Sequence, residues 1–99
     1  MKISVRRSGG FAGLSEELVA LDTANLDASA AQRAEQLVGE IRFFELPPEI
    51  AVGTIGADMF RYEVTVTDAG RQHSVGFVAD DSPATARLRG LVDALTQIG

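Results

Sequence analysis

The stretch MFRYEVTVTDAGRQHSVGFV, residues 59–78, decides the fold. Its first half alternates four apolar residues with four polar ones: Phe60, Tyr62, Val64 and Val66 against Arg61, Glu63, Thr65 and Thr67. A period of two is typical of a strand with one buried face. The second half returns with His73 and Phe77 on one face, and DAG at 68–70 predicts a three-residue hairpin connection with Gly70 in the left-handed region. The pair therefore forms an antiparallel hairpin that needs cover on one side.

A second hairpin is predicted at the amino-terminal end of the sequence. Ile3 and Val5 alternate with polar neighbours, as in a strand, and SGGFAGL at 8–14 supplies the glycines of a turn. The return strand over 16–23 has two possible inward faces, Leu18 with Ala20 or Val19 with Leu21. Its apolar pattern alone leaves both open.

One helix is expected between the hairpins. Ser29 and Gln32 have the spacing of a capping box, so the helix should begin at about Ala30 and stop before Pro47. Its buried face would hold Ala30, Ala34, Leu37, Val38, Ile41 and Phe44. We also assign Phe43, Phe44, Leu46 and Pro47 to the core, because they prolong that face.

The segment after this helix and the end of the chain complete the pattern. Residues 49–58 contain two glycines and no clean period, which indicates a loop, with a short extended piece at 51–52. A second helix should be capped by Ser82 and begin at Pro83. Its apolar face consists of Ala84, Leu88, Leu91, Val92, Leu95 and Ile98.

The order of elements is ββαββα, which predicts an α+β fold. Sequential hairpins imply antiparallel pairing, and two amphipathic helices need one sheet face to cover. We predict a single domain over residues 1–99, with a four-stranded antiparallel sheet and both helices on one face.

Composition excludes several classes of function. The 9 basic residues are scattered among 14 acidic ones, for a net charge of −5, so a phosphate-binding surface is not expected and nucleic acid is a poor partner. The chain has no cysteine, and no stretch approaches the length of an apolar membrane span. No apolar run follows the positively charged start, so we expect a cytoplasmic protein without a membrane partner.

Candidate catalytic groups are few. His73 is the only histidine, and we interpret it as a partly buried sheet residue with one satisfied nitrogen. Its neighbour Ser74 points to the opposite side of a strand, so the two do not form a catalytic pair. The acidic pairs at 16–17 and 80–81 suit solubility and a helix dipole. We expect no enzyme activity, no metal and no cofactor, and hence a binding module.

Four segments in this order resemble the emfourin family of bacterial protein inhibitors: SGGFAG at 8–13, FFELP at 43–47, YEVTV at 62–66 with its Asp-x-Gly turn, and the Leu-rich final helix. The resemblance covers nearly the whole chain. It implies a cytoplasmic inhibitor that occupies the active-site cleft of thermolysin-like metallopeptidases such as protealysin and is not itself a catalyst.

The resemblance also directs the choice of contact residues. Thermolysin-like enzymes have a deep apolar pocket that accepts Leu, Ile, Val or Phe, so an inhibitor should present such a side chain on a loop beside small residues. Three loops offer this combination, and the candidate protease-binding residues are Phe11, Leu14, Asn25, Leu26, Val52, Ile55 and Gly56. Phe11 and Leu14 have an alternative role, in which they fold back over the core.

A different function remains open on the same fold. The polar face of the sheet, with Arg61, Glu63, Thr65 and Gln72, could pair with a second copy in a small interaction or ligand-sensing module. The inhibitor reading instead predicts a monomer in the free state.

Overall fold

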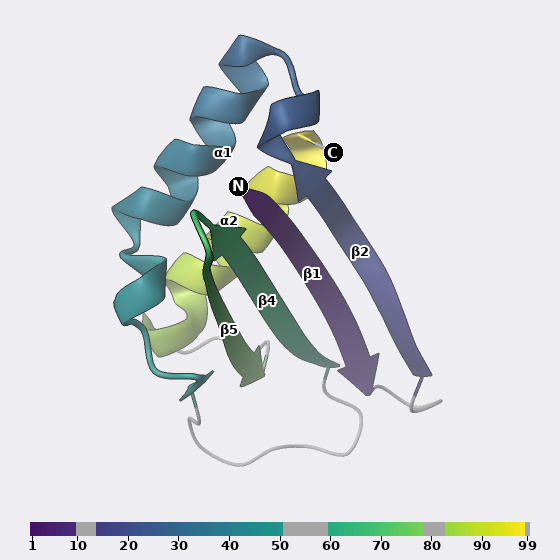
Figure 1. The fold of residues 1–99 in the computed structure, drawn as a ribbon. Helices are drawn as coiled ribbons and strands as arrows, with labels where there is room; N and C mark the ends of the chain where they lie inside the picture. The colour runs from purple at the N-terminus through teal and green to yellow at the C-terminus, as the bar shows by residue number, and fades with distance from the viewer. Residues whose placement is uncertain (10–13, 51–59, 79–82, 99) are drawn as a thin grey trace.

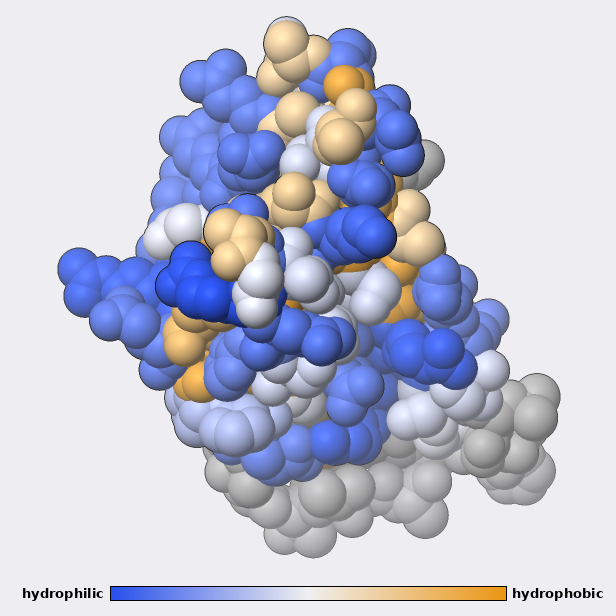
Figure 2. Space-filling view, viewed as in Figure 1, coloured by the Kyte–Doolittle hydropathy of each residue, from blue (hydrophilic) through white to orange (hydrophobic). Residues whose placement is uncertain are grey.

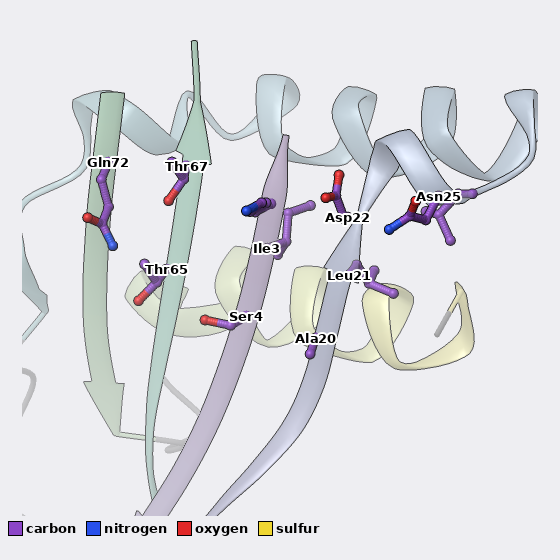
Figure 3. Close-up of a pocket in the computed structure, with 11 residues that line it drawn as sticks. Ile3, Ser4, Ala20, Leu21, Asp22, Asn25, Thr65, Thr67 and Gln72 are labelled. Atoms are coloured by element: carbon purple, nitrogen blue, oxygen red, sulfur yellow. The ribbon is translucent and has the colours of Figure 1, made fainter. Parts of the chain in front are cut away.

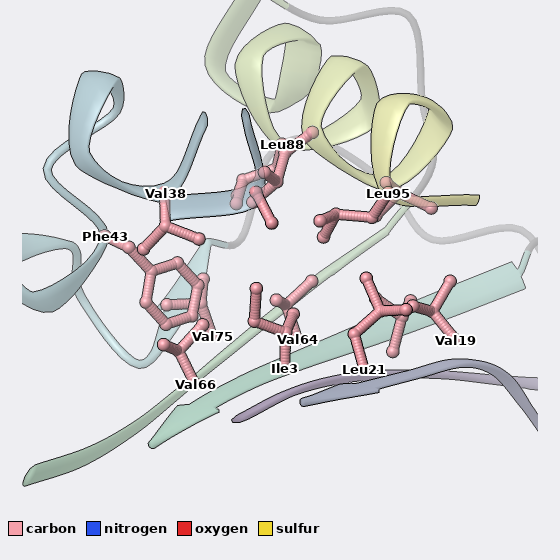
Figure 4. Close-up of a cluster of buried hydrophobic side chains, with 14 of the residues drawn as sticks. Ile3, Val19, Leu21, Val38, Phe43, Val64, Val66, Val75, Leu88 and Leu95 are labelled. Atoms are coloured by element: carbon pink, nitrogen blue, oxygen red, sulfur yellow. The ribbon is translucent and has the colours of Figure 1, made fainter. Parts of the chain in front are cut away.

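The computed structural model describes residues 1–9, 14–50, 60–78 and 83–98. The elements in chain order are β1 Lys2–Gly9, β2 Leu14–Asp22, the 3-10 helix η1 Thr23–Asn25, α1 Ala28–Glu40, the 3-10 helix η2 Phe43–Glu45, β3 Glu49–Ile50, β4 Phe60–Asp68, β5 Arg71–Val78 and α2 Pro83–Ile98. The α+β class is confirmed, with two helices over one face of the sheet (Figures 1 and 4).

The sheet has five strands in the order β2-β1-β4-β5-β3. The first four are antiparallel, as predicted, but β3 pairs parallel with β5, so the prediction of a four-stranded antiparallel sheet is wrong at this edge. The extended piece lies at residues 49–50, and 51–52 fall outside the described residues. The Gly76 amide donates to the Pro48 carbonyl over 2.8 Å, which joins this short strand to the edge of β5.

The core lies between the sheet and the helices (Figure 4). Side chains from four strands contact those of α1, η2 and α2, and the fully buried ones include Ile3, Val5, Phe43, Val64, Val66, Val75, Phe77, Leu88 and Leu95. Val19 and Leu21 are the inward residues of β2, which settles the choice left open by the pattern. Leu18 lies where the β1–β2 register shifts, and it is half-buried.

The start of α1 differs from the prediction. Asp27 is the N-cap, with its backbone still extended, and its Oδ1 accepts from the Ala30 amide over 2.8 Å. The helix begins at Ala28, so Ser29 already has helical geometry and cannot cap with Gln32. Two capping signals lie two residues apart here, and the earlier one is used.

The end of α1 also corrects the predicted core. The helix stops at Glu40 and Arg42 adopts a left-handed conformation, with φ of 51°. The 3-10 turn that follows buries Phe43 and leaves Phe44 half-buried. Leu46 is half-buried and Pro47 is exposed, so Pro47 does not belong to the core.

The predicted turn between β4 and β5 and the predicted second helix can be compared with the structure in part. The β4–β5 connection has two residues, Ala69 and Gly70, because Asp68 already pairs with Arg71. Helix α2 begins at Pro83 as expected, whereas Ser82 lies outside the described residues. Of its predicted face, Leu88, Leu91, Val92 and Leu95 are buried, Ile98 packs against the core, and the side chain of Ala84 is not described.

Candidate functional site

The sheet has two ends that carry different residues. At one end Gly9 pairs with both Leu14 and Phe60, and Val78 pairs with Arg61 in the next strand pair; we call this the Gly9 end. At the other, Lys2 pairs with Asp22 and Thr67, and the β4–β5 turn lies beside them; we call this the Met1 end. The eight residues of β1 separate the two by about 23 Å, at roughly 3.3 Å per residue.

The candidate contact residues divide between these ends. Leu14 is the first residue of β2, at the Gly9 end. Phe11, Val52, Ile55 and Gly56 lie outside the described residues. The described residues that flank them in sequence (Gly9, Leu14, Ile50 and Phe60) lie at or near the Gly9 end, since Ile50 pairs with Phe77 next to Tyr62.

Asn25 and Leu26 lie at the Met1 end instead. The 3-10 turn η1 is attached there, because the Thr23 amide donates to the Met1 carbonyl over 2.9 Å and the Leu26 amide donates to the Thr23 carbonyl over 3.3 Å. Asn25 is exposed, whereas Leu26 is half-buried against the core. Leu14 and Leu26 therefore lie at opposite ends of the sheet and belong to two separate candidate surfaces.

Five described side chains form a cluster at the Gly9 end. The Arg7 guanidinium pairs with Glu16 on the neighbouring strand and lies over the Phe60 ring, with its carbon 4.4 Å from the ring centroid. Hydrogen bonding to Glu16, and to a lesser extent to Tyr62, raises the pKa of Arg7 above its ordinary value. Tyr62 in turn stacks on Phe77, with centroids 5.5 Å apart.

Phe60 is a candidate contact residue that the sequence did not single out. It is the one large hydrophobic residue that the described part of the chain leaves exposed, at 40 %. Alternation along β4 puts it on the same face as buried Val64 and Val66, but it is the first residue of the strand, at the sheet end. Its place at the start of a strand, next to a glycine-containing segment, was the available signal.

An ion pair holds the opposite face of the same end. Arg61 of β4 donates to both carboxylate oxygens of Glu49 in β3, and the pair crosses directly over Gly76 of β5. The hydrogen bond to Arg61 lowers the pKa of Glu49 from its ordinary value of 4.5. The ion pair thus links the short edge strand β3 to β4 across β5.

The sheet face away from the helices carries a shallow groove near the Met1 end (Figure 3). Its volume is about 520 Å³, and polar side chains on it come from β1, β2, β4, β5 and η1: Lys2, Ser4, Asp22, Asn25, Thr65, Thr67 and Gln72. On the face that Figure 2 shows, the described residues are mainly hydrophilic, with hydrophobic residues between them. Apolar side chains line the same groove, so it offers both polar and apolar contacts: Ile3, Ala20, Leu21 and Leu26.

The described side chains do not assemble a catalytic pair around His73. Its Nε2 lies 2.7 Å from the Leu46 carbonyl oxygen, and its ring packs edge-on against Phe43, with centroids 5.5 Å apart. Ser74 lies on the other face, where its hydroxyl is 2.8 Å from that of Thr65. The prediction of a half-buried sheet histidine with one satisfied nitrogen is confirmed.

The described residues contain neither a cluster of metal-ligating side chains nor a membrane-spanning helix. Within 1–9, 14–50, 60–78 and 83–98, there is no group of three or more His, Cys, Asp or Glu side chains placed to hold a metal ion. Neither described helix is long and apolar enough to cross a bilayer.

Comparison with known proteins identifies a family but no individual relative. Searches of curated proteins and of solved structures found no match. The sequence model of the Emfourin family, in contrast, matches residues 5–96, which include every strand and helix described above apart from a few terminal residues. The chain therefore belongs to the Emfourin family.

Proposed function

We propose that the protein inhibits thermolysin-like zinc metallopeptidases by occupying the active-site cleft, without catalysing a reaction. Membership of the Emfourin family over residues 5–96 is the observation that carries this proposal. The pairing of the only histidine with a backbone carbonyl agrees with a binding role. We further propose that the protein acts as a monomer in the cytoplasm.

The Gly9 end is the better candidate for entry into the cleft. Leu14 lies there, and Phe11, Val52, Ile55 and Gly56 belong to segments that are joined in sequence to described residues at that end. These segments combine apolar side chains, which an apolar substrate pocket accepts, with small glycine neighbours. Asn25 and Leu26, about 23 Å away at the Met1 end, form the competing candidate surface.

Inhibition is tested by titrating thermolysin and protealysin, each of known active-site concentration, with the purified protein. Cleavage of a peptide substrate should stop at about one inhibitor per enzyme, and electrophoresis should show the inhibitor chain intact. Unchanged activity of both enzymes, and of any metallopeptidase encoded beside the inhibitor gene, would reject the proposal.

Two alanine variants identify the end that binds. Ile55→Ala should weaken inhibition by about 2 kcal/mol if its side chain fills the apolar pocket. Leu26→Ala should leave inhibition by the folded protein unchanged but lower the melting temperature, because Leu26 packs against the core. The reverse result would assign binding to the Met1 end.

One observation supports the alternative of self-association. Both helices cover the same face, so neither of them covers the face with Thr65 and Gln72, which carries the groove (Figures 1 and 3). The charged side chains of Lys2 and Asp22 in this groove differ from the charge-depleted core of a stable homodimer interface. Sedimentation equilibrium should therefore give the monomer mass, and a dimer that Thr65→Arg dissociates would favour the alternative.

A further inference from the structure

We infer that Phe60 and Arg7 form a preorganised contact unit that packs against the peptidase beside its cleft. The inference rests on the proposed function and extends it to side chains that the structure describes. The partner surface would be apolar opposite the Phe60 ring, with a carboxylate or carbonyl oxygen within reach of the Arg7 guanidinium.

The position of Phe60 supports this role. Its pairing with Gly9 puts it in the strand next to β1, and residue 60 directly follows the segment that contains Val52 and Ile55. The ring is 40 % exposed, so a substantial part of its apolar surface stays in water in the free protein. The ring would gain from burying that surface on association.

The unit is also held in one arrangement before any partner arrives. Glu16 fixes the Arg7 guanidinium, which lies over the ring at 4.4 Å from its centroid. A contact that is already ordered loses less conformational entropy on binding. Aromatic and arginine side chains are also enriched among the residues that dominate binding energy.

A second arginine–aromatic pair in the same molecule provides the comparison. At the Met1 end, Arg71 lies over Phe44, also at 4.4 Å from the ring centroid. Phe44 has a structural explanation, because it packs against the core beside Phe43 and His73. Phe60 lies outside that core. The geometry is shared, but among the described residues the core that includes Phe44 does not include Phe60.

The shape of the pair indicates where it would bind. Arg7 covers one face of the Phe60 ring, so the unit is thicker than a single side chain. Such a unit suits a broad apolar surface better than a narrow pocket. We therefore place it on the rim of the cleft, with the pocket left to an apolar residue of the adjoining segments.

The experiment compares matched variants of the two pairs. Phe60→Ala and Arg7→Lys are made at the Gly9 end, with Phe44→Leu and Arg71→Lys as controls at the Met1 end. Inhibition constants against thermolysin and protealysin are measured well below each variant's melting temperature. Lysine keeps the charge of arginine but loses its planar guanidinium, so Arg7→Lys tests the stacked geometry.

Phe60→Ala should weaken inhibition about 30-fold and Arg7→Lys about 10-fold, while both controls stay within about 3-fold of the wild type. The melting temperature of Phe60→Ala should stay close to that of the wild type. The double variant should lose less than the product of the two single losses, because the side chains act together.

The outcomes separate the inference from the proposed function. If the wild type inhibits and Phe60→Ala inhibits equally well, the contact unit is wrong and the inhibitor function stands. Stronger losses in the Met1-end controls than in the Gly9-end variants would also overturn the inference. If the wild type inhibits neither enzyme, nor any metallopeptidase encoded beside its gene, the proposed function fails and the inference fails with it.

Discussion

At the scale of single residues, the β4–β5 turn holds a non-glycine residue in a left-handed conformation. Ala69 has φ of 51° and Gly70 has φ of 81°, so both central residues of the turn have the positive φ of a type I′ hairpin. Asparagine tolerates this geometry better than alanine. We expect Ala69→Asn to raise the unfolding free energy by about 0.5 to 1 kcal/mol, measured by urea titration. A fall in stability would contradict this account of the turn.

Gly76 gives a residue-scale prediction whose sign depends on its neighbours. A Cβ at this position would lie 2.6 Å from Glu49 Oε2 and against the Arg61 guanidinium, so Gly76→Ala must displace the ion pair. In an Arg61→Ala background the guanidinium is removed and the exposed Glu49 side chain, no longer paired, is free to move aside, so the same change should stabilise by about 0.4 to 1 kcal/mol, through the unfolded state. In the wild type the gain should be absent or reversed. Gly90→Ala, where a Cβ meets no atom within 4 Å, is the control.

At the scale of elements, the stability that strand β3 contributes should depend on pH through Glu49. Folding lowers the pKa of Glu49 because Arg61 donates hydrogen bonds to its carboxylate. The stabilisation is therefore complete above the ordinary value of 4.5 and is lost as the pH falls through the lower value of the folded state.

The test compares the wild type with Glu49→Gln in urea titrations at pH 7 and pH 3. The glutamine variant should be less stable by under about 1 kcal/mol at pH 7, since both side chains are exposed to solvent. This difference should shrink at pH 3. Glu35→Gln on α1 controls for the loss of a negative charge, and a constant difference across pH would show that Arg61 does not stabilise β3 through Glu49.

The elements that the sequence predicts are those whose signals are local. The alternation at 60–67 and 71–78 predicts β4 and β5, because a period of two on one face is recorded within each strand. Strand β3 is two residues long and depends on contacts with Arg61 and Gly76, so no local pattern reveals it. Alternation likewise gives the side on which Phe60 lies but not how far the core extends along that strand.

The candidate site could be predicted from the sequence only in part, for the same reason. The loops were chosen from apolar residues beside glycines, which is a local signal. Which loops share an end of the sheet depends on strand order and register, and these place Leu14 and Leu26 at opposite ends. The Arg7–Glu16 pair is likewise set by the register between β1 and β2.

At the scale of the whole molecule, stability and inhibition should depend on different residues. Phe43 is 1 % exposed and Leu95 is fully buried, so truncating either side chain leaves a cavity between the sheet and the helices. Phe43→Ala should cost about 3 to 5 kcal/mol and Leu95→Ala about 2 to 5 kcal/mol, a large part of a small domain's stability. Phe44→Ala should cost less, because Phe44 is only half-buried.

Inhibition by the core variants should follow the folded fraction alone. At a temperature where Phe43→Ala is mostly folded, its inhibition constant, corrected for that fraction, should equal the wild-type value. Phe43 lies beside Met1 and Arg71, towards the Met1 end of the sheet, so its truncation should leave the Gly9 end unchanged. Phe60→Ala should do the opposite and lose affinity while fully folded. Circular dichroism melts and inhibition assays on the same samples compare the two. A corrected loss in Phe43→Ala as large as that in Phe60→Ala would mean that the core and the binding surface are coupled, so that the Gly9 end does not act as a rigid surface carried by an independent scaffold.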